Sequence, residues 1–107
     1  MNQRIQSELD IIKDGILETI PAEAIYLFGS YANGTPDEDS DLDIYVVVPD
    51  MEIDLIDLRS KIRKNLWEKK TMPMDLLVGK SSVFNRRKQG LTLESLIAQN
   101  GVLLHGL

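Results

Sequence analysis

Two aspartates, Asp41 and Asp43, are the residues of this 107-residue chain best suited to chemistry. The hydrophobic residues Leu42 and Ile44 are interleaved with them at the start of an apolar segment. Because side chains alternate between the two faces of a strand, both carboxylates should lie on one face. Paired carboxylates are typical ligands of Mg²⁺ beside substrate phosphates. The pair therefore predicts a site for one or two Mg²⁺ ions bridged to a triphosphate.

A turn suited to phosphate precedes this pair. The apolar segment 24–28 ends at Gly29, and Ser30 stands where a helix could begin. The serine hydroxyl and the free backbone N–H groups of such a turn would face outward, as phosphate binding requires. Ten residues separate Ser30 from Asp41. The turn and the carboxylates together predict a nucleotide site.

A third carboxylate, Asp75, lies within the apolar segment 74–78. An ionised carboxylate inside an apolar strand is costly unless it is paired or bound to metal. If this strand neighbours the one that carries Asp43, Asp75 could ligate a second metal and help to deprotonate an acceptor hydroxyl. The alternative is that Asp75 lies in water at the strand entrance. The presence of the other two aspartates favours the functional interpretation.

Other acidic sites fit the sequence less well. A calcium loop that starts at Asp37 would need glycine at its sixth position and glutamate at its twelfth, where the chain has Leu42 and Val48. The Asp-x-Asp motif also occurs in sugar transferases, but their fold needs a longer chain, and Gly29 and Ser30 would have no role. Neither alternative is therefore preferred.

The hydrophobic pattern predicts helices and strands in alternation. Helices are expected at 3–19, 31–33, 52–70, 81–88 and 92–99, and strands at 24–28, 41–48, 74–78 and 102–104. Gly79 is expected to end the third strand. This alternation predicts an α/β (α+β) architecture, in which helices back a small mixed β-sheet. We expect one domain over residues 1–107.

The composition excludes some classes of function. The chain has no cysteine, which excludes disulfides, thiolate nucleophiles and cysteine-based zinc sites. Its formal charge of −5 argues against direct binding of nucleic acid and is compatible with docking on a basic protein. No apolar run approaches the roughly 20 residues of a membrane span. We therefore expect a cytoplasmic protein without membrane contact.

The stretch from Ala24 to Val48 resembles the nucleotidyltransferase superfamily that includes DNA polymerase β. That family pattern is a hydrophobic residue, Gly-Ser, a spacer of about this length, and carboxylates alternating with hydrophobic residues. The small size of the chain and the sequence of this stretch are most similar to those of the minimal nucleotidyltransferases, or MNT proteins. These usually pair with a HEPN-domain protein as the antitoxin of a toxin–antitoxin module. The resemblance implies a polymerase β-like fold.

The resemblance also implies roles for individual residues. Nucleotide binding would fall to Gly29 and Ser30 with Asn33, which stands where close relatives often carry arginine and so removes a cation near the phosphates. Mg²⁺ binding and catalysis would fall to Asp41, Asp43 and Asp75.

The implied reaction transfers a nucleoside monophosphate, AMP from ATP, to a hydroxyl with two Mg²⁺ ions as cofactors. The implied acceptor is a tyrosine of the HEPN toxin, whose RNase activity would be silenced. A homo- or hetero-oligomer is compatible with this function. Two other functions stay open: a non-catalytic antitoxin that inhibits the toxin by binding alone, and transfer to a small molecule such as an aminoglycoside. Enzymes of the latter kind carry an additional helical domain.

Overall fold

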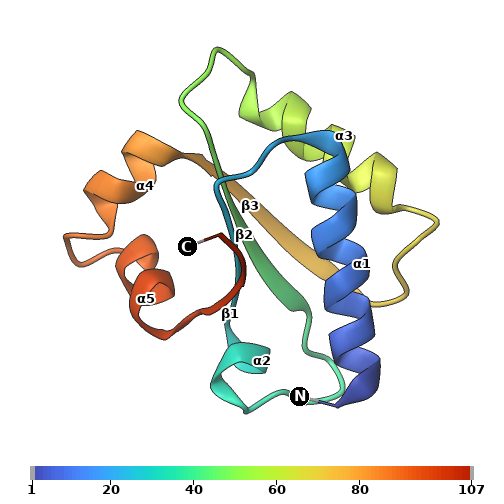
Figure 1. Cartoon of the computed structure of the whole chain (residues 1–107). Helices are drawn as coiled ribbons and strands as arrows, with labels where there is room; N and C mark the ends of the chain where they lie inside the picture. The colour runs from blue at the N-terminus through green and yellow to red at the C-terminus, as the bar shows by residue number, and fades with distance from the viewer. Residues whose placement is uncertain (1, 107) are drawn as a thin grey trace.

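A four-stranded mixed β-sheet is the centre of the fold. The computed structural model describes residues 2–106 and places the strands in the order β3-β2-β1-β4 (Figure 1). Their bounds are β1 (Ala24–Phe28), β2 (Leu42–Val48), β3 (Met74–Lys80) and β4 (Val102–His105). β1 pairs antiparallel with β2 and with β4, whereas β2 and β3 are parallel. The predicted mixed sheet backed by helices is confirmed.

Two long helices, α1 (Gln3–Thr19) and α3 (Leu55–Leu66), cover one face of the sheet (Figure 1). Asn2 caps α1 by accepting a hydrogen bond from the Ile5 backbone N–H at 2.9 Å. The main hydrophobic core lies between these helices and the sheet, and most of its members are aliphatic. Its largest fully buried side chains are Leu9, Ile12, Ile16, Ile25, Leu27, Leu42, Ile44, Leu58, Ile62, Leu66 and Leu76.

The opposite face is covered by two short helices, α4 (Ser81–Arg87) and α5 (Leu93–Asn100). Their packing forms a smaller core in which Phe84 of α4 and Ile97 of α5 meet β2. The Phe84 ring stacks on Tyr26 of β1 at a centroid distance of 5.7 Å. Asp43, one of the predicted site residues, lies on this second face.

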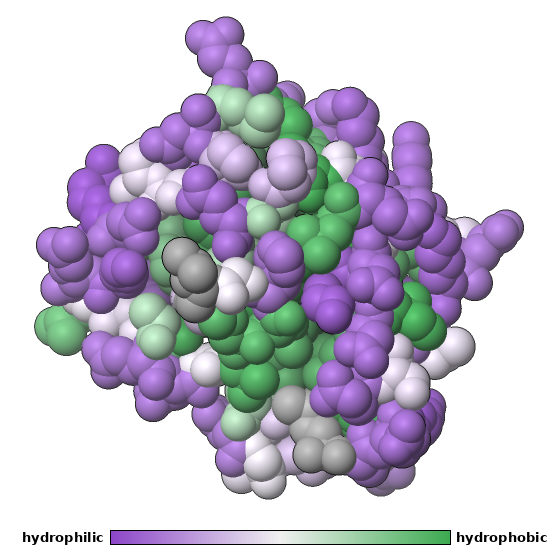
Figure 2. All heavy atoms as spheres, in the orientation of Figure 1, coloured by the Kyte–Doolittle hydropathy of each residue, from purple (hydrophilic) through white to green (hydrophobic). Residues whose placement is uncertain are grey.

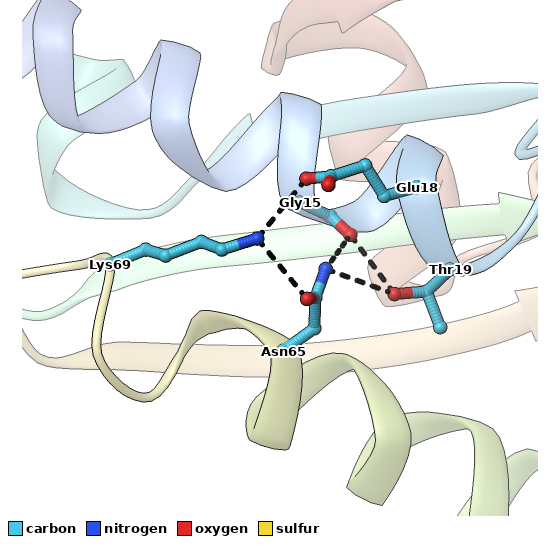
Figure 3. Close-up of polar contacts among 5 residues, drawn as sticks. All are labelled: Gly15, Glu18, Thr19, Asn65 and Lys69. Carbon is cyan, nitrogen blue, oxygen red and sulfur yellow. Dashed lines mark hydrogen bonds and ion pairs between the residues drawn. The ribbon is translucent and has the colours of Figure 1, made fainter.

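A polar bridge joins α1 to α3 (Figure 3). The Asn65 side chain donates to the Gly15 carbonyl oxygen at 2.9 Å and to the Thr19 hydroxyl at 3.4 Å. The Lys69 ammonium donates to Asn65 at 3.2 Å and pairs with Glu18 at 3.3 Å. A Cβ at Gly15 would collide with the Leu66 side chain, so the glycine lets the two helices approach closely.

The structure departs from the sequence-based bounds at several places, among them the end of α3, which lies at Leu66 rather than at residue 70. α3 begins at Leu55 rather than near residue 52, because the Asp54 carboxylate accepts from the Ile56 and Asp57 N–H groups and caps the helix. β2 begins at Leu42 rather than at residue 41. Gly79 does not end β3, which runs on to Lys80. A glycine is needed at that position because a Cβ there would meet the Tyr45 hydroxyl.

Among the described helices, none combines the length and the apolar character needed to cross a membrane.

Candidate functional site

Asp43 and Asp75 are directly paired across two neighbouring strands. In the parallel register of β2 and β3, Asp43 is the partner of Asp75, and neighbouring strands lie about 4.8 Å apart. The condition on which the functional interpretation of Asp75 depends, that its strand neighbours the strand of Asp43, is therefore met. Asp43 is partly buried and Asp75 is exposed, so Asp75 is both next to Asp43 and open to solvent. Asp41 directly precedes β2 and is also exposed.

The face that carries these carboxylates follows from the alternation along each strand. Tyr45 and Val47, which follow Asp43 at intervals of two, belong to the smaller core under α4 and α5. Asp43 therefore lies on that same face, at the edge of the area that the two short helices cover. Leu42 and Ile44 point the other way and are fully buried in the main core.

Gly29 lies close to the Asp43 carboxylate, on the side of the neighbouring strand β1. It follows β1, where Phe28 is the register partner of Asp43. Its backbone angles, φ 76° and ψ −154°, belong to a region that is essentially restricted to glycine. A Cβ built on Gly29 would collide with the Asp43 carboxylate. Both the backbone conformation and the close approach thus require glycine at this turn.

The turn continues into a single helical turn, α2 (Ser30–Asn33), as the sequence predicts. The Asn33 N–H donates to the Gly29 carbonyl at 3.0 Å, and the Thr35 N–H donates to the Ser30 carbonyl at 2.9 Å. Ser30 is partly buried and Asn33 is exposed. α2 contacts both β1 and β2, so the predicted phosphate residues lie beside the strand that carries Asp43.

The three carboxylates influence one another electrostatically. Burial raises the pKa of Asp43, and the negative charges of Asp75 and then Asp41 raise it further. A cation among these groups would relieve the repulsion. Within residues 2–106, however, no three or more His, Cys, Asp or Glu side chains are arranged as a closed ligand set for a metal. The group fits Mg²⁺ in another way, because this ion is usually held by one or two carboxylates together with substrate phosphates and water.

A cleft of about 210 Å³ opens next to Gly29. One wall comes from the turn and α2, and the other wall comes from α5. Its lining residues are Phe28, Gly29, Ala32, Asn33, Leu93, Leu96, Ile97, Asn100 and Gly101. The sequence analysis missed the α5 wall, because a short amphipathic helix far along the chain gives no signal that it lies beside the Gly-Ser turn.

A buried polar network ties α5 to β2, the strand that carries Asp43, and it too was missed by the sequence analysis. Glu94 of α5 accepts from the Tyr45 hydroxyl at 3.1 Å and from the Arg87 guanidinium at 3.0 Å. Burial and the charge of Glu94 raise the pKa of Tyr45. Burial alone would raise the pKa of Glu94, but the hydrogen bonds from Arg87, from its own backbone and from Tyr45 outweigh it and lower that pKa.

Comparison with known proteins places this geometry in a family context. The sequence matches the family profile of the nucleotidyltransferase domain over residues 9–98. None of the curated proteins compared with the chain matches it.

Several solved structures are similar to the chain. A variant of the toxin–antitoxin complex MntA–HpeT is 28% identical with a TM-score of 0.62, and the match covers 100% of this chain and 75% of the other. A toxin–antitoxin structure with AMP-PNP is 25% identical with a TM-score of 0.59, covering 92% and 73%. A protein of Sulfolobus solfataricus assigned as a nucleotidyltransferase is 21% identical with a TM-score of 0.63, covering 99% and 89%, and shows the shared fold.

Proposed function

The chain belongs to the nucleotidyltransferase domain family, and from this premise we propose that it transfers AMP from ATP to a protein hydroxyl. The observation that carries this proposal is the register pairing of Asp43 with Asp75 beside the Gly29 turn. A transferase of this kind needs carboxylates on one rigid surface next to a phosphate-binding turn. Strands β2 and β3 supply such a surface, because their inner face is packed into the main core.

The turn would bind the donor nucleotide. Gly29 lets the turn approach the Asp43 carboxylate closely, and Ser30 would offer its hydroxyl to the triphosphate at the start of α2. Asn33 would add a neutral amide at the end of the same helical turn. Asp41 and Asp43 would hold Mg²⁺, with Asp75 completing the set. When bound, one or two Mg²⁺ ions would neutralise the triphosphate and make its α-phosphorus more electrophilic.

The transfer itself replaces one phosphorus–oxygen bond by another. The acceptor hydroxyl oxygen attacks the α-phosphorus, the bond from that phosphorus to the oxygen bridging the β-phosphate breaks, and pyrophosphate leaves. Asp75 takes the proton of the hydroxyl and returns it to water. Its exposure supports this role, since an acceptor carried by another protein must reach the base from solvent.

For the acceptor we propose a tyrosine of a HEPN-domain toxin, which the modification would silence as an RNase. The support is the similarity of this chain to the toxin–antitoxin structures, one of which contains a nucleotide analogue. The chain would then be a catalytic antitoxin rather than an enzyme of metabolism.

A binding-only antitoxin is the second candidate, and the distribution of cations favours it. No lysine or arginine lies between Lys13 and Arg59. The turn, α2 and the following loop therefore bring no positive charge to a triphosphate. If Mg²⁺ cannot compensate for this, the chain would inhibit its partner by occupying it.

Mass spectrometry of the partner tests the proposal. The HEPN-domain protein is incubated with this chain, Mg²⁺ and each of the four nucleoside triphosphates in turn. We expect a mass increase of one or more AMP units with ATP, and none when Asp41→Asn is combined with Asp43→Asn.

The matched control is the double variant Glu38→Gln with Asp39→Asn, which removes the same number of carboxylates from exposed positions in the preceding loop. It should transfer AMP like the wild type. A stable complex that shows no mass increase would favour the binding-only antitoxin, and full activity of the Asp41→Asn/Asp43→Asn variant would reject the roles given to these carboxylates.

A further inference from the structure

The end of the chain differs in charge from the rest. Four of the twelve lysines and arginines lie after Gly79, but only one of the seventeen acidic residues does, in a chain whose net charge is −5. The one acidic residue is the buried Glu94, which Arg87 neutralises at 3.0 Å. Arg86 and Lys88 are exposed beside this pair. The surface of α4 and of the loop that follows it is therefore positively charged.

Three exposed leucines stand next to these cations. Leu91 is fully exposed in the loop between α4 and α5, and Leu93 and Leu96 reach solvent from α5, the latter with 59% of its surface accessible. We call Leu91, Leu93 and Leu96 the leucine surface. They line a hollow of about 560 Å³ together with Thr92, Ser95 and Gln99. Single exposed leucines are ordinary, but a contiguous group marks an interaction surface.

Figure 2 shows a molecule that is hydrophilic over most of the face in view, with the broadest hydrophobic area over the sheet and only small hydrophobic groups at the side of α4 and α5. An apolar group on that side would bury its area only against another molecule.

The helix that carries Leu93 and Leu96 is held in place by hydrogen bonds to its neighbours. Glu94 ties α5 to Tyr45 of β2 and to Arg87 of α4. Thr92 caps α5 by accepting from the Ser95 N–H at 3.1 Å, and its hydroxyl donates to the Arg87 carbonyl at 2.6 Å. A surface that is fixed before binding loses little conformational entropy when a partner docks.

The leucine surface is continuous with the candidate site. Leu93 and Leu96 also line the cleft whose opposite wall is formed by Gly29 and Asn33. A protein seated on the leucines would therefore lie next to the phosphate-binding turn. A docking surface at that place could deliver an acceptor side chain to the carboxylates.

We propose that the leucine surface docks the toxin partner through an apolar helical face bordered by aspartate and glutamate. This rests on the proposed function, whose partner it locates. The charge of Arg86 and Lys88 requires acidic groups around the apolar contact. RNA would also meet these cations, but single-stranded RNA is bound by stacking on aromatic rings, and leucines do not provide this.

Binding of a HEPN-domain toxin, the partner that the proposed function requires, tests the surface by isothermal titration calorimetry. Leu91→Glu should weaken binding about tenfold or more, because it places a carboxylate against an acidic rim and removes apolar contact. Leu91→Lys should weaken binding less. Leu91 contacts neither the cleft nor the carboxylates, so the affinity for AMP-PNP should stay at the wild-type value in both variants.

Two control variants change other strongly exposed apolar residues, which lie on the opposite face of the sheet. Ile56 and Trp67, which are 72% and 80% exposed, lie on or next to α3. Ile56→Glu and Trp67→Glu should bind the toxin like the wild type. Arg86→Glu should weaken binding, and the wild-type affinity should fall as salt rises.

Some outcomes would overturn the docking surface. One is that Leu91→Glu binds the toxin with wild-type affinity, and another is that Leu91→Glu and Ile56→Glu lose toxin affinity equally. A third is that the chain alone self-associates and Leu91→Glu abolishes this association, which would identify a second copy as the occupant. Binding of an RNA oligonucleotide that Arg86→Glu abolishes, with toxin affinity unchanged, would assign the surface to RNA.

The docking surface and the proposed function can fail separately. If the toxin binds, Leu91→Glu weakens the complex and the wild-type chain still transfers no AMP, the surface stands and the enzymatic function fails. If Leu91→Glu modifies the toxin as fast as the wild type at toxin concentrations below saturation, the function stands and the surface fails.

Discussion

Asp43 of β2 lies directly opposite Asp75 of β3 in a parallel register, although α3 and two loops separate the two residues in the sequence. The pairing brings two negative charges to one face and contributes to the raised pKa of Asp43. Such an arrangement destabilises the protein unless a cation or a proton joins it, which is typical of a site selected for chemistry rather than for stability.

Replacing Gly29 should damage both the fold and nucleotide binding. Gly29→Ala forces a side chain into a glycine-only conformation, which costs about 1–3 kcal/mol, and its Cβ would displace the Asp43 carboxylate. Calorimetric titration with AMP-PNP and Mg²⁺ should show loss of binding, and thermal unfolding should show the loss of stability.

Gly34 provides the matched control for that variant. It also has a positive φ, 75°, but a Cβ there would meet nothing within 4 Å. Gly34→Ala should therefore cost only about 1 kcal/mol of backbone strain and leave nucleotide binding intact. Equal effects of the two variants on binding would contradict the role of Gly29 beside Asp43.

Removing the charge of Asp43 should stabilise the protein at neutral pH. Its pKa is raised in the folded state, so the folded protein takes up the proton more readily than the unfolded one. The stability of the wild type therefore falls as pH rises from about the unfolded pKa, 3.8, through the folded pKa. Asp43→Asn should be more stable than the wild type above that interval, and the difference should vanish below it.

Mg²⁺ should reverse the order of stability of the wild type and Asp43→Asn. A cation relieves the repulsion among Asp41, Asp43 and Asp75, so millimolar Mg²⁺ should raise the melting temperature of the wild type. The shift should be small or absent in Asp43→Asn. Differential scanning calorimetry at pH 7 with and without Mg²⁺ measures both effects, and equal shifts in the two proteins would argue against a cation site at Asp43.

The buried network should show strong coupling between Tyr45 and Glu94. Glu94→Ala leaves the buried Tyr45 hydroxyl without its acceptor, which costs about 1–3 kcal/mol. In the double variant with Tyr45→Phe the hydroxyl is gone, so the two losses should not add. Chemical denaturation of the wild type, both single variants and the double variant measures the coupling, and strict additivity would refute it.

The polar bridge between α1 and α3 should contribute to stability and not to transfer activity. Asn65→Ala removes the hydrogen bond to the Gly15 carbonyl and should lower the free energy of unfolding by about 1 kcal/mol. Lys61→Ala, which breaks an exposed ion pair with Asp57 on the same helix, should cost about 0.5 kcal/mol or less. Transfer activity should be unchanged in both, and reduced activity in Asn65→Ala would extend the site to that face.

The sequence predicts much of this architecture, because its signals are local. Alternation around Asp43, the helical spacing of Ile5, Leu9 and Ile12, and the glycine after Phe28 each depend on neighbouring residues only. The order β3-β2-β1-β4 and the α5 wall of the cleft depend instead on contacts between distant segments. Glu94 illustrates the same limit. An acidic residue on a short helix is expected to be exposed to solvent, and only the structure shows that Tyr45 and Arg87 surround it.

The amount of this chain needed to silence the toxin tests the central claim most directly. The RNase activity of the HEPN protein is measured after incubation with ATP, Mg²⁺ and about one molecule of this chain per hundred of toxin. A catalytic antitoxin turns over, so we expect complete loss of RNase activity, dependence on ATP, and no loss with the Asp41→Asn/Asp43→Asn variant. Inhibition that needs one molecule of this chain per toxin and proceeds without ATP would contradict the account and identify an antitoxin that acts by binding.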